Sequence, residues 1–399
     1  MKKVLIATCC IALLSGSLSV SAQKKSDVQA QKKSAAKSVS ASSLTGKSWS
    51  ADNGNGTFTN PLFYDEFSDP DIIRVGEDYY LAGTTMHSVP GLVVLHSKDL
   101  VNWEFSSYCF DRFDDSDDFN LRNGKEAYGQ GIWAPAIRYH NGKFYIFSNI
   151  NGHGLQVYIS DSAKGPWTHH KINGDIYDLS VLFDDDGKIY AVHKYGNVTV
   201  TELKPDLSGP VEGSSKVVIP EGNAMGEGHH VYKINGMYYI LSADYSPMGR
   251  MQCARSMSIW GPYETCVISE RESFGYAAGW SVGNMGIGRP LPEDGFKFQN
   301  NQPNGVNLGC ATIHQGGIVQ APDGKWWGVS MQDFNAVGRT VCLSPITWVD
   351  GWPYFGLEKN LGRSPRTWFK PNDKVKTPQA PYDRCDDFSG KTFKPVWQW

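Results

Sequence analysis

The sequence predicts an all-β fold, a five-bladed β-propeller, from its composition and from a motif that recurs five times. The chain of 399 residues has 42 Gly and is rich in aromatic residues, with 13 Trp, 19 Tyr and 18 Phe. Aromatic side chains favour β-strands, and glycine favours the tight turns between them. Each copy of the motif has enough sequence for roughly four short strands, which is one propeller blade.

The recurring motif is a glycine turn followed by a run that opens with large side chains. The copies are Gly76 before Tyr79 and Tyr80, Gly142 before Phe144 and Tyr145, Gly187 before Ile189 and Tyr190, Gly236 before Met237, Tyr238 and Tyr239, and Gly324 before Trp326 and Trp327. Each copy predicts a β-hairpin. A tryptophan, expected to end an outer strand, recurs in HSKDLVNWEF, SDSAKGPWTHH, ARSMSIWGPYE and SPITWVDGWPYF. A β-sandwich would not explain a fivefold recurrence.

The two ends of the chain lack this motif. Residues 1–22 have two lysines, an apolar run and a small-residue cleavage site, which predict a signal peptide and a secreted or periplasmic protein. Residues 23–55 are rich in Lys, Ser and Ala and predict a flexible linker, because they offer little apolar surface to bury. The propeller is expected over residues 56–370. A Pro-rich connector opens the remaining segment, 371–399.

Charge and hydropathy exclude two kinds of partner. The formal net charge is −3, and nucleic-acid binding needs a basic face to neutralise phosphates, so no nucleic acid is expected. No segment reaches the roughly 18 apolar residues of a membrane-spanning helix, so no transmembrane segment is expected. Six cysteines follow the signal peptide, with no metal-binding spacing, and are expected to be buried thiols. A Cys253–Cys266 bridge between neighbouring strands is the alternative.

Equivalent positions of the five copies carry residues suited to chemistry. Counting 11 to 13 residues back from the second aromatic residue of each hairpin, or from the Tyr that fills its place, gives Asp69, Trp133, Asp178, Glu227 and His314. Because the innermost strands of a propeller line its axis, these positions are expected to meet as a ring at one mouth of the channel. Three carboxylates crowded there repel one another, so the pKa of at least one should be raised.

The ring has the groups that glycoside hydrolysis requires. That reaction needs one carboxylic acid to protonate the leaving oxygen and one carboxylate to attack the sugar or to activate water. Taken singly, each acid is better explained as a turn or capping residue. Their equivalent placement in three blades favours the catalytic interpretation.

At these residues the sequence resembles glycoside hydrolase family 43, which contains five-bladed β-xylosidases, α-L-arabinofuranosidases and arabinanases. The matching segments, within residues 59 to 385, are NPLFYDEFSDPDIIRVGEDYYL, VPGLVVLHSKDLVNWEF, GIWAPAIRYHNGKFYIF, IYDLSVLFDDDGKIYAV, EGHHVYKINGMYYILSA and GRTVCLSPITWVDGWPYF. The resemblance implies that Asp69 is the general base, that Glu227 is the general acid, and that Asp178 orients Glu227 and raises its pKa. It also implies that residues 371–399 contain the truncated start of a C-terminal β-sandwich.

Further residues are expected near the sugar. Trp133 is expected to line the pocket, because Pro135 limits strand pairing and the ring position faces the axis. Arg339 resembles the arginine of the family that hydrogen-bonds a sugar hydroxyl, and a surface salt bridge is the alternative. No cofactor is required. His314 matches the place of a structural Ca²⁺ or its water shell at the axis, and a buried, hydrogen-bonded histidine is the alternative.

The identity of the sugar stays open at this point. Xylosidase-like relatives often have aromatic residues in the segment that here reads TTMHSVPG, where this chain offers only Met86 and His87 as pocket wall. Trp280, in an aromatic-rich insertion, is expected to cap the pocket or to pack within its loop.

The sequence therefore predicts an inverting, exo-acting glycoside hydrolase. Its substrate would be a plant cell-wall polysaccharide or oligosaccharide from which it releases arabinose or xylose. An endo-arabinanase and a carbohydrate-binding propeller without catalysis are the alternatives. Three converging acids argue against the binding module, which has no use for them.

Overall fold

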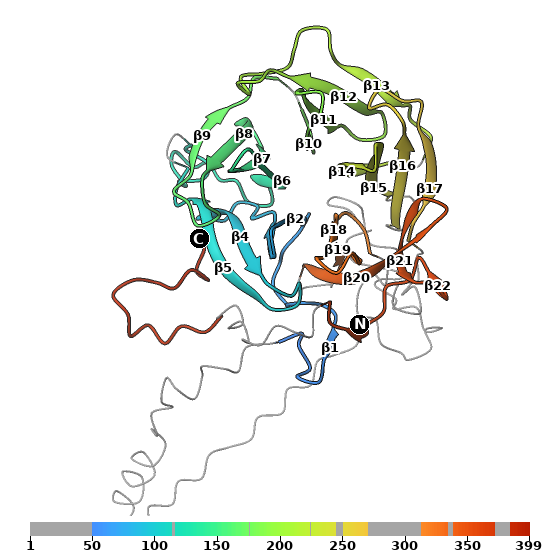
Figure 1. Cartoon of the computed structure of the whole chain (residues 1–399). Coiled ribbons are helices and arrows are strands. Elements are labelled where there is room, and N and C mark those ends of the chain that lie inside the picture. Colours follow the sequence, from blue (N-terminus) through green and yellow to red (C-terminus); the bar gives the residue numbers. More distant parts are fainter. Residues whose placement is uncertain are drawn as a thin grey trace, which may run out of the picture. The chain divides into compact units, whose positions relative to one another are not determined.

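The structure is a computed structural model that describes residues 50–113, 116–174, 176–223, 225–244, 250–269, 313–333, 338–371 and 384–399. All regular secondary structure in these residues is β-strand. Five sheets lie around a central axis, with β2 (Asp71–Val75), β6 (Ile132–His140), β10 (Ser180–Phe183), β14 (Glu227–Ile234) and β18 (Ile318–Gln320) innermost (Figure 1). The predicted all-β, five-bladed propeller is confirmed.

The strands of each blade follow one another in the sequence, and neighbours pair antiparallel. Blade 1 continues with β3 (Asp78–Ala82), β4 (Gly91–Ser97) and β5 (Trp103–Phe110). Blade 2 continues with β7 (Lys143–Ile150), β8 (Gly154–Ser160) and β9 (Thr168–Lys171). Blade 3 continues with β11 (Ile189–His193), β12 (Val198–Leu203) and β13 (Lys216–Ile219).

The last two blades continue the same order. Blade 4 adds β15 (Met237–Asp244), β16 (Arg250–Ser256) and β17 (Glu264–Val267) to its inner strand. Blade 5 adds β19 (Trp326–Asp333), β20 (Arg339–Val349), β21 (Trp352–Leu357) and the short β22 (Asn360–Leu361), so that it has five strands where four were expected.

The five predicted hairpins join the first and second strands of the five blades. The glycine of each turn has a positive φ, between 64° at Gly76 and 83° at Gly324. An added Cβ would meet nothing within 4 Å at any of the five turns. The backbone conformation, which L-residues with a Cβ adopt at a cost, is therefore what requires glycine there.

The recurring tryptophans lie at the start of the outer strands, and the expectation that they end those strands was wrong. Trp103 is the first residue of β5, Trp167 directly precedes β9, and Trp260 lies in the turn that leads into β17. Their rings pack onto the blade cores, as Trp260 does edge-on against Tyr190 at a centroid distance of 5.6 Å. Each ring thus covers apolar surface where the chain enters the exposed edge of a blade.

Apolar side chains between adjacent blades form the core. Five clusters of buried residues occupy these interfaces, and large side chains such as Ile72, Ile146 and Phe355 are at most 1% exposed. Burying a side chain of this size contributes about 1.5–3 kcal/mol. The interfaces between blades therefore hold the innermost strands in place around the axis.

The propeller is closed where the chain before blade 1 meets blade 5. β1 (Thr57–Thr59) pairs with β23 (Thr367–Phe369). The Asn60 amide extends this contact, since it accepts the N–H of Leu343 and donates to its carbonyl, both at 2.8 Å. Closure therefore fixes the segment that leads to Asp69 against β20, the strand that begins with Arg339.

A buried polar network joins four blades below the ring of acids. Arg138 of β6 donates to the Asp71 carboxylate of β2 and to the Ser180 hydroxyl of β10, both at 2.5 Å. The Ser180 hydroxyl also accepts the main-chain N–H of Val231 in β14, at 3.0 Å. Because a buried charge without a partner is costly, these residues restrict how the blades can shift relative to one another.

The cysteines of the described residues are all free thiols. Cys253 of β16 and Cys266 of β17 lie directly opposite each other in the strand register without forming a bridge. Cys109, Cys253 and Cys342 are buried, whereas Cys266 and Cys385 are partly exposed. Cys310 lies outside the described residues. No helix within the described ranges is long and apolar enough to cross a membrane.

The described chain ends contact blade 1 and the closure region. Ala51 is 2% exposed, and Asp52 pairs with Lys370, so packing begins before residue 55. Residues 384–399 have no strand, and Trp399 exchanges two main-chain hydrogen bonds with Val89 (2.8 and 2.9 Å). This segment therefore runs beside the loop between β3 and β4.

Candidate active site

A pocket of about 280 Å³ opens at one end of the propeller axis. Its walls come from all five blades, and three of its side chains are the predicted acids. The lining residues are Asp69, Met86, Trp133, Ala134, Asn149, Asn151, Tyr177, Asp178, Glu227, Gln315 and Arg339. Four of the five ring positions counted from the sequence thus reach one pocket. At the fifth, the neighbouring Gln315 lines the pocket in place of His314.

Backbone strain turns these residues toward the axis. Asp69 and Asp178 lie just before β2 and β10 with φ of 52° and 51°, while Ala134 and Gln315 have φ of 34° and 44°. Such values are uncommon for residues with a Cβ and cost on the order of 1–3 kcal/mol each. They occur in four blades, at the counted position or one residue after it, where the chain reaches the pocket.

Asp69 is held by one hydroxyl and faces one cation. Thr84 donates from its hydroxyl to Oδ2 of Asp69 at 2.6 Å, and the same hydroxyl accepts the N–H of Ala134 at 2.9 Å. Nη1 of Arg339 lies 3.5 Å from Oδ1 of Asp69. The residue is 8% exposed. The carboxylate is therefore fixed in orientation while it still borders the pocket, as a base that positions a water requires.

Glu227 begins β14 and receives a hydrogen bond from the phenol of Tyr177 to its Oε2 at 2.7 Å. Loss of solvation raises the pKa of Glu227, the negative charge of Asp69 raises it further, and the Tyr177 hydrogen bond opposes both. The balance is a raised pKa. A carboxyl group whose pKa is raised keeps its proton to higher pH, which suits a proton donor.

Asp178 contacts the main chain beside Glu227. Its Oδ2 accepts the N–H of Gly228 at 2.8 Å. Burial raises the pKa of Asp178 well above its usual range, and the charges of Glu227 and Asp69 raise it further. Asp178 and Glu227 therefore do not ionise independently, and the pocket holds at least one proton more readily than separate acids would.

Trp133 and Arg339 also border the pocket, as the sequence suggested. The indole N–H of Trp133 is buried and has no acceptor among the described residues. A buried donor without a partner is costly, so it is available to a ligand hydroxyl. The Arg339 side chain is 37% exposed and directs its guanidinium toward Asp69.

Besides Ala134, four polar lining residues were not expected from the sequence. Tyr177 directly precedes the counted position Asp178, and Asn149 is the strand partner of Trp133. Their proximity to predicted site residues could therefore have indicated that both line the pocket. Asn151 accepts the N–H of Gly131 at 2.6 Å, and Gln315 follows His314. Together these side chains add amide and hydroxyl groups of the kind that hydrogen-bond sugars.

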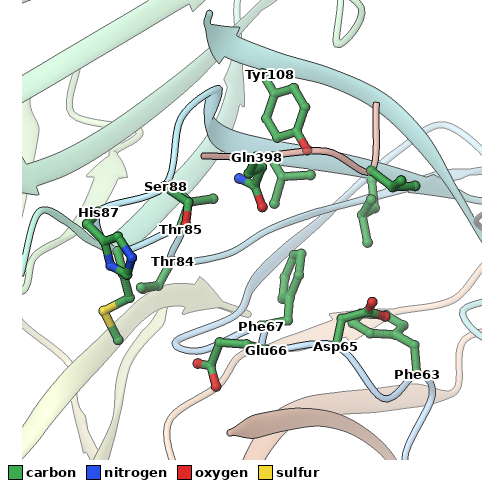
Figure 2. A pocket seen from close by; sticks show the side chains of 14 residues that line it. Phe63, Asp65, Glu66, Phe67, Thr84, Thr85, His87, Ser88, Tyr108 and Gln398 are labelled. Atoms are coloured by element: carbon green, nitrogen blue, oxygen red, sulfur yellow. The ribbon is translucent and has the colours of Figure 1, made fainter. Parts of the chain in front are cut away.

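Met86 and His87 lie at a second cavity of about 210 Å³ beside the first. Met86 lines both cavities, whereas His87 lines only the second, together with Glu66 and Thr84 (Figure 2). The structure therefore places Met86 in the wall of the candidate active site and His87 outside it. Trp280 lies outside the described residues.

His314 is buried, and its main chain forms two hydrogen bonds with that of Met331. In the part of the chain that the structure describes, no three His, Cys, Asp or Glu side chains are grouped so as to hold a metal ion. Ca²⁺ takes six to eight oxygen ligands. No such group of side chains surrounds His314 among the described residues, and no chemical step is assigned to a metal.

Known proteins similar to this chain share the region that contains the three acids. The model of the glycosyl hydrolases family 43 matches residues 58–272, which is more than half of the chain and includes all three acids. The chain belongs to glycosyl hydrolase family 43. A solved structure of this family, engineered in its active site to display both endo-xylanase and exo-arabinofuranosidase activity, matches with a TM-score of 0.69 at 29% identity. The match covers 86% of this chain and 62% of that one.

Two relatives of the chain are named as a xylosidase and an arabinofuranosidase. The chain is 28% identical to the beta-xylosidase of Formosa agariphila over 412 residues, which cover 92% of this chain and 62% of that protein. It is 33% identical to the non-reducing end alpha-L-arabinofuranosidase BoGH43B of Bacteroides ovatus over 332 residues, which cover 79% of this chain and 56% of that protein. The chain thus spans between 56% and 62% of the length of these two relatives.

Proposed function

We propose that this protein is an inverting, exo-acting glycoside hydrolase that releases arabinose or xylose from plant cell-wall polysaccharides or oligosaccharides. The observation that carries the proposal is the convergence of Asp69, Asp178 and Glu227 in one pocket at the propeller axis. Membership of family 43 supports the reaction class. The names of the two relatives support the pentose sugars and attack at the non-reducing end.

The size of the pocket supports an exo enzyme. Its volume of about 280 Å³ lies below the ~300–1,000 Å³ typical of ligand pockets. Side chains from five blades surround it. Such a pocket suits a single terminal sugar, whereas an enzyme that cleaves within a chain needs a groove open at both ends.

In the proposed mechanism Glu227 donates its proton to the leaving oxygen as the glycosidic bond breaks. Asp69 takes a proton from a water molecule, which attacks the anomeric carbon from the opposite side and inverts its configuration. Thr84 keeps the Asp69 carboxylate in position through its hydrogen bond. Asp178 holds the main chain at Gly228 and so orients Glu227.

The proposal is tested with the purified protein and a panel of 4-nitrophenyl glycosides. Hydrolysis of the α-L-arabinofuranoside or the β-D-xyloside should exceed that of glucosides. Proton NMR of the first product should show the anomer opposite to that of the substrate. Retention of configuration would contradict Asp69 as a base, and dominant internal cleavage of linear arabinan would contradict an exo enzyme.

We also infer from residues 1–22 that the protein is exported and acts on sugars outside the cytoplasm. The support is the charged, apolar and small-residue order of that segment. Amino-terminal sequencing of the protein from the native cell envelope or medium should begin after Ala22. A mature chain that begins at Met1 would contradict export by this route.

A further inference from the structure

Glu66 ties the loop before Asp69 to the start of β20. Its Oε2 accepts the main-chain N–H of Arg339 at 2.6 Å, and its Oε1 accepts the hydroxyl of Ser68. The next residue, Phe67, donates its main-chain N–H to the carbonyl of Arg339 at 2.8 Å. Both main-chain polar groups of Arg339 are therefore held by residues 66 and 67.

The glycine beside Arg339 makes this contact possible. Gly338 has a φ of 95°, and a Cβ added to it would overlap the Glu66 carboxylate. Any side chain at residue 338 would therefore displace Glu66 in addition to straining the backbone. At this position glycine is needed for space as well as for conformation.

The contact between Glu66 and Arg339 also affects Asp69, the candidate base, because Arg339 faces Asp69. Nη1 of Arg339 lies 3.5 Å from Oδ1 of Asp69, and both residues line the catalytic pocket. Glu66 lies outside that pocket, at the wall of the second cavity (Figure 2). Glu66 thus lies behind the pair formed by Arg339 and Asp69. It accepts a hydrogen bond from the main chain of Arg339, which sets where the side chain that carries the guanidinium begins.

The pKa of Glu66 reflects its loss of solvation, its contacts with Ser68 and Arg339 and the nearby charge of Asp69. Loss of solvation at its carboxylate raises the pKa of Glu66, as does the charge of Asp69, while the Ser68 and Arg339 interactions oppose the rise. The residue as a whole is solvent-exposed, and it also lines the second cavity. Its carboxylate is therefore held by directed hydrogen bonds at an accessible site.

We propose that Glu66 is a positioning residue, which fixes the main chain at Gly338–Arg339 so that the guanidinium of Arg339 faces Asp69 and the bound sugar. This inference rests on the proposed glycosidase function. Glu66 does not touch the reacting atoms and acts through Arg339. Its removal should therefore matter only while Arg339 is present.

A double-mutant cycle on an aryl pentoside measures this dependence. Glu66→Ala and Arg339→Ala should each lower kcat/KM by about tenfold to a hundredfold, as expected for loss of a hydrogen bond to a charged group. In the Arg339→Ala background, Glu66→Ala should cost less than about threefold. Glu66→Gln keeps an acceptor for the Arg339 N–H and should retain most of the activity. Multiplicative losses in the double variant would overturn the proposal.

Matched variants separate positioning from folding. Asp206 is an exposed carboxylate that accepts the main-chain N–H of Ser208 at 3.0 Å, far along blade 3, and Asp206→Ala should leave kcat/KM unchanged. Gly338→Ala should reproduce the loss seen in Glu66→Ala. Gly76→Ala introduces a Cβ at positive φ with nothing within 4 Å, and it should lower the Tm without that loss.

The second cavity offers an additional readout. Because it borders Glu66, a small carboxylate can reach the space that Glu66→Ala vacates. Added formate should therefore restore part of the activity of Glu66→Ala and none of that of Gly338→Ala, in which Cβ occupies the space. If the wild-type protein cleaves no pentoside, the proposed function fails. If the wild type is active and Glu66→Ala matches it, only the role of Glu66 fails.

Discussion

The phenol of Tyr177 donates a hydrogen bond to Oε2 of Glu227 over 2.7 Å and so links the loop before β10 to the first residue of β14. The donor favours the ionised carboxylate, because a hydrogen bond from an O–H group stabilises negative charge on the acceptor. It lowers the pKa of Glu227 against the effect of burial. Tyr177 thereby sets the pH range in which Glu227 remains an acid.

Replacing Tyr177 with Phe removes this hydrogen bond and leaves the ring. The ionised form of Glu227 loses support, so the pKa of Glu227 should rise and the basic limb of the kcat/KM profile should move to higher pH. Tyr195→Phe, at an exposed tyrosine, is the control and should leave the limb in place. A limb that moves to lower pH in Tyr177→Phe would contradict this role.

Glu227→Ala should separate substrates by their leaving groups. A natural oligosaccharide leaves as a poor alkoxide that needs a proton, so kcat should fall by about a hundredfold to ten-thousandfold. A 4-nitrophenyl glycoside leaves with little help and should lose much less. The measurement compares the two substrates on the same enzyme preparation. Equal losses on both would remove the assignment of Glu227 as the acid.

Gly228 should be required for activity because of what surrounds it. It has a φ of 67°, donates its N–H to Asp178, and an added Cβ would collide with the side chain of Gln315. Gly228→Ala should therefore displace the main chain beside Glu227 and lower kcat/KM by at least about tenfold.

Gly236→Ala is the matched control for Gly228→Ala. Gly236 has a φ of 80° in the β14–β15 hairpin, and a Cβ there would meet nothing within 4 Å. Both variants should lose about 1–2 kcal/mol of stability from backbone strain, as measured by denaturant unfolding. Only Gly228→Ala should lose activity. Similar kinetics for the two variants would show that the contact with Gln315 does not matter.

The blade repeat could be predicted because its cause is local. A hairpin turn with positive φ favours glycine, and large side chains follow where each second strand enters the core, as at Gly142 and Phe144. Five copies of one local pattern then determine the number of blades. The same count placed Asp69, Asp178 and Glu227 at equivalent positions. These positions lie at the starts of innermost strands, and equivalent strands of a propeller start at the same mouth of the axis.

The remainder of the candidate site depends on conformations that local propensity disfavours. Met86 has a φ of 53°, and His87 beyond it lines the second cavity, a direction that no residue pattern indicates. Ala134 likewise adopts a φ of 34° that its residue type does not favour. The role of Glu66 has no local signal in the sequence, because its partner, the N–H of Arg339, is 273 residues away and is brought close only by the closure of the propeller.

Asp178→Asn tests how the two neighbouring acids share protons. The change keeps an oxygen that can accept the Gly228 N–H, so the orientation of Glu227 should persist, and it removes one negative charge from the pocket. Repulsion between Asp178 and Glu227 raises the pKa of Asp178, and a repulsion acts on both partners. Without that charge Glu227 should lose its proton more easily.

The basic limb of kcat/KM in Asp178→Asn should therefore move to lower pH, and activity lost at neutral pH should partly return as the pH falls. Asp178→Ala removes the acceptor as well, so it should show the same shift together with a lower maximum, because Glu227 is then no longer oriented. The profiles are measured on an unactivated oligosaccharide, for which proton donation limits the rate. A limb that stays in place in Asp178→Asn would mean that Asp178 is already protonated in the active enzyme, and its effect would then be confined to the hydrogen bond with Gly228.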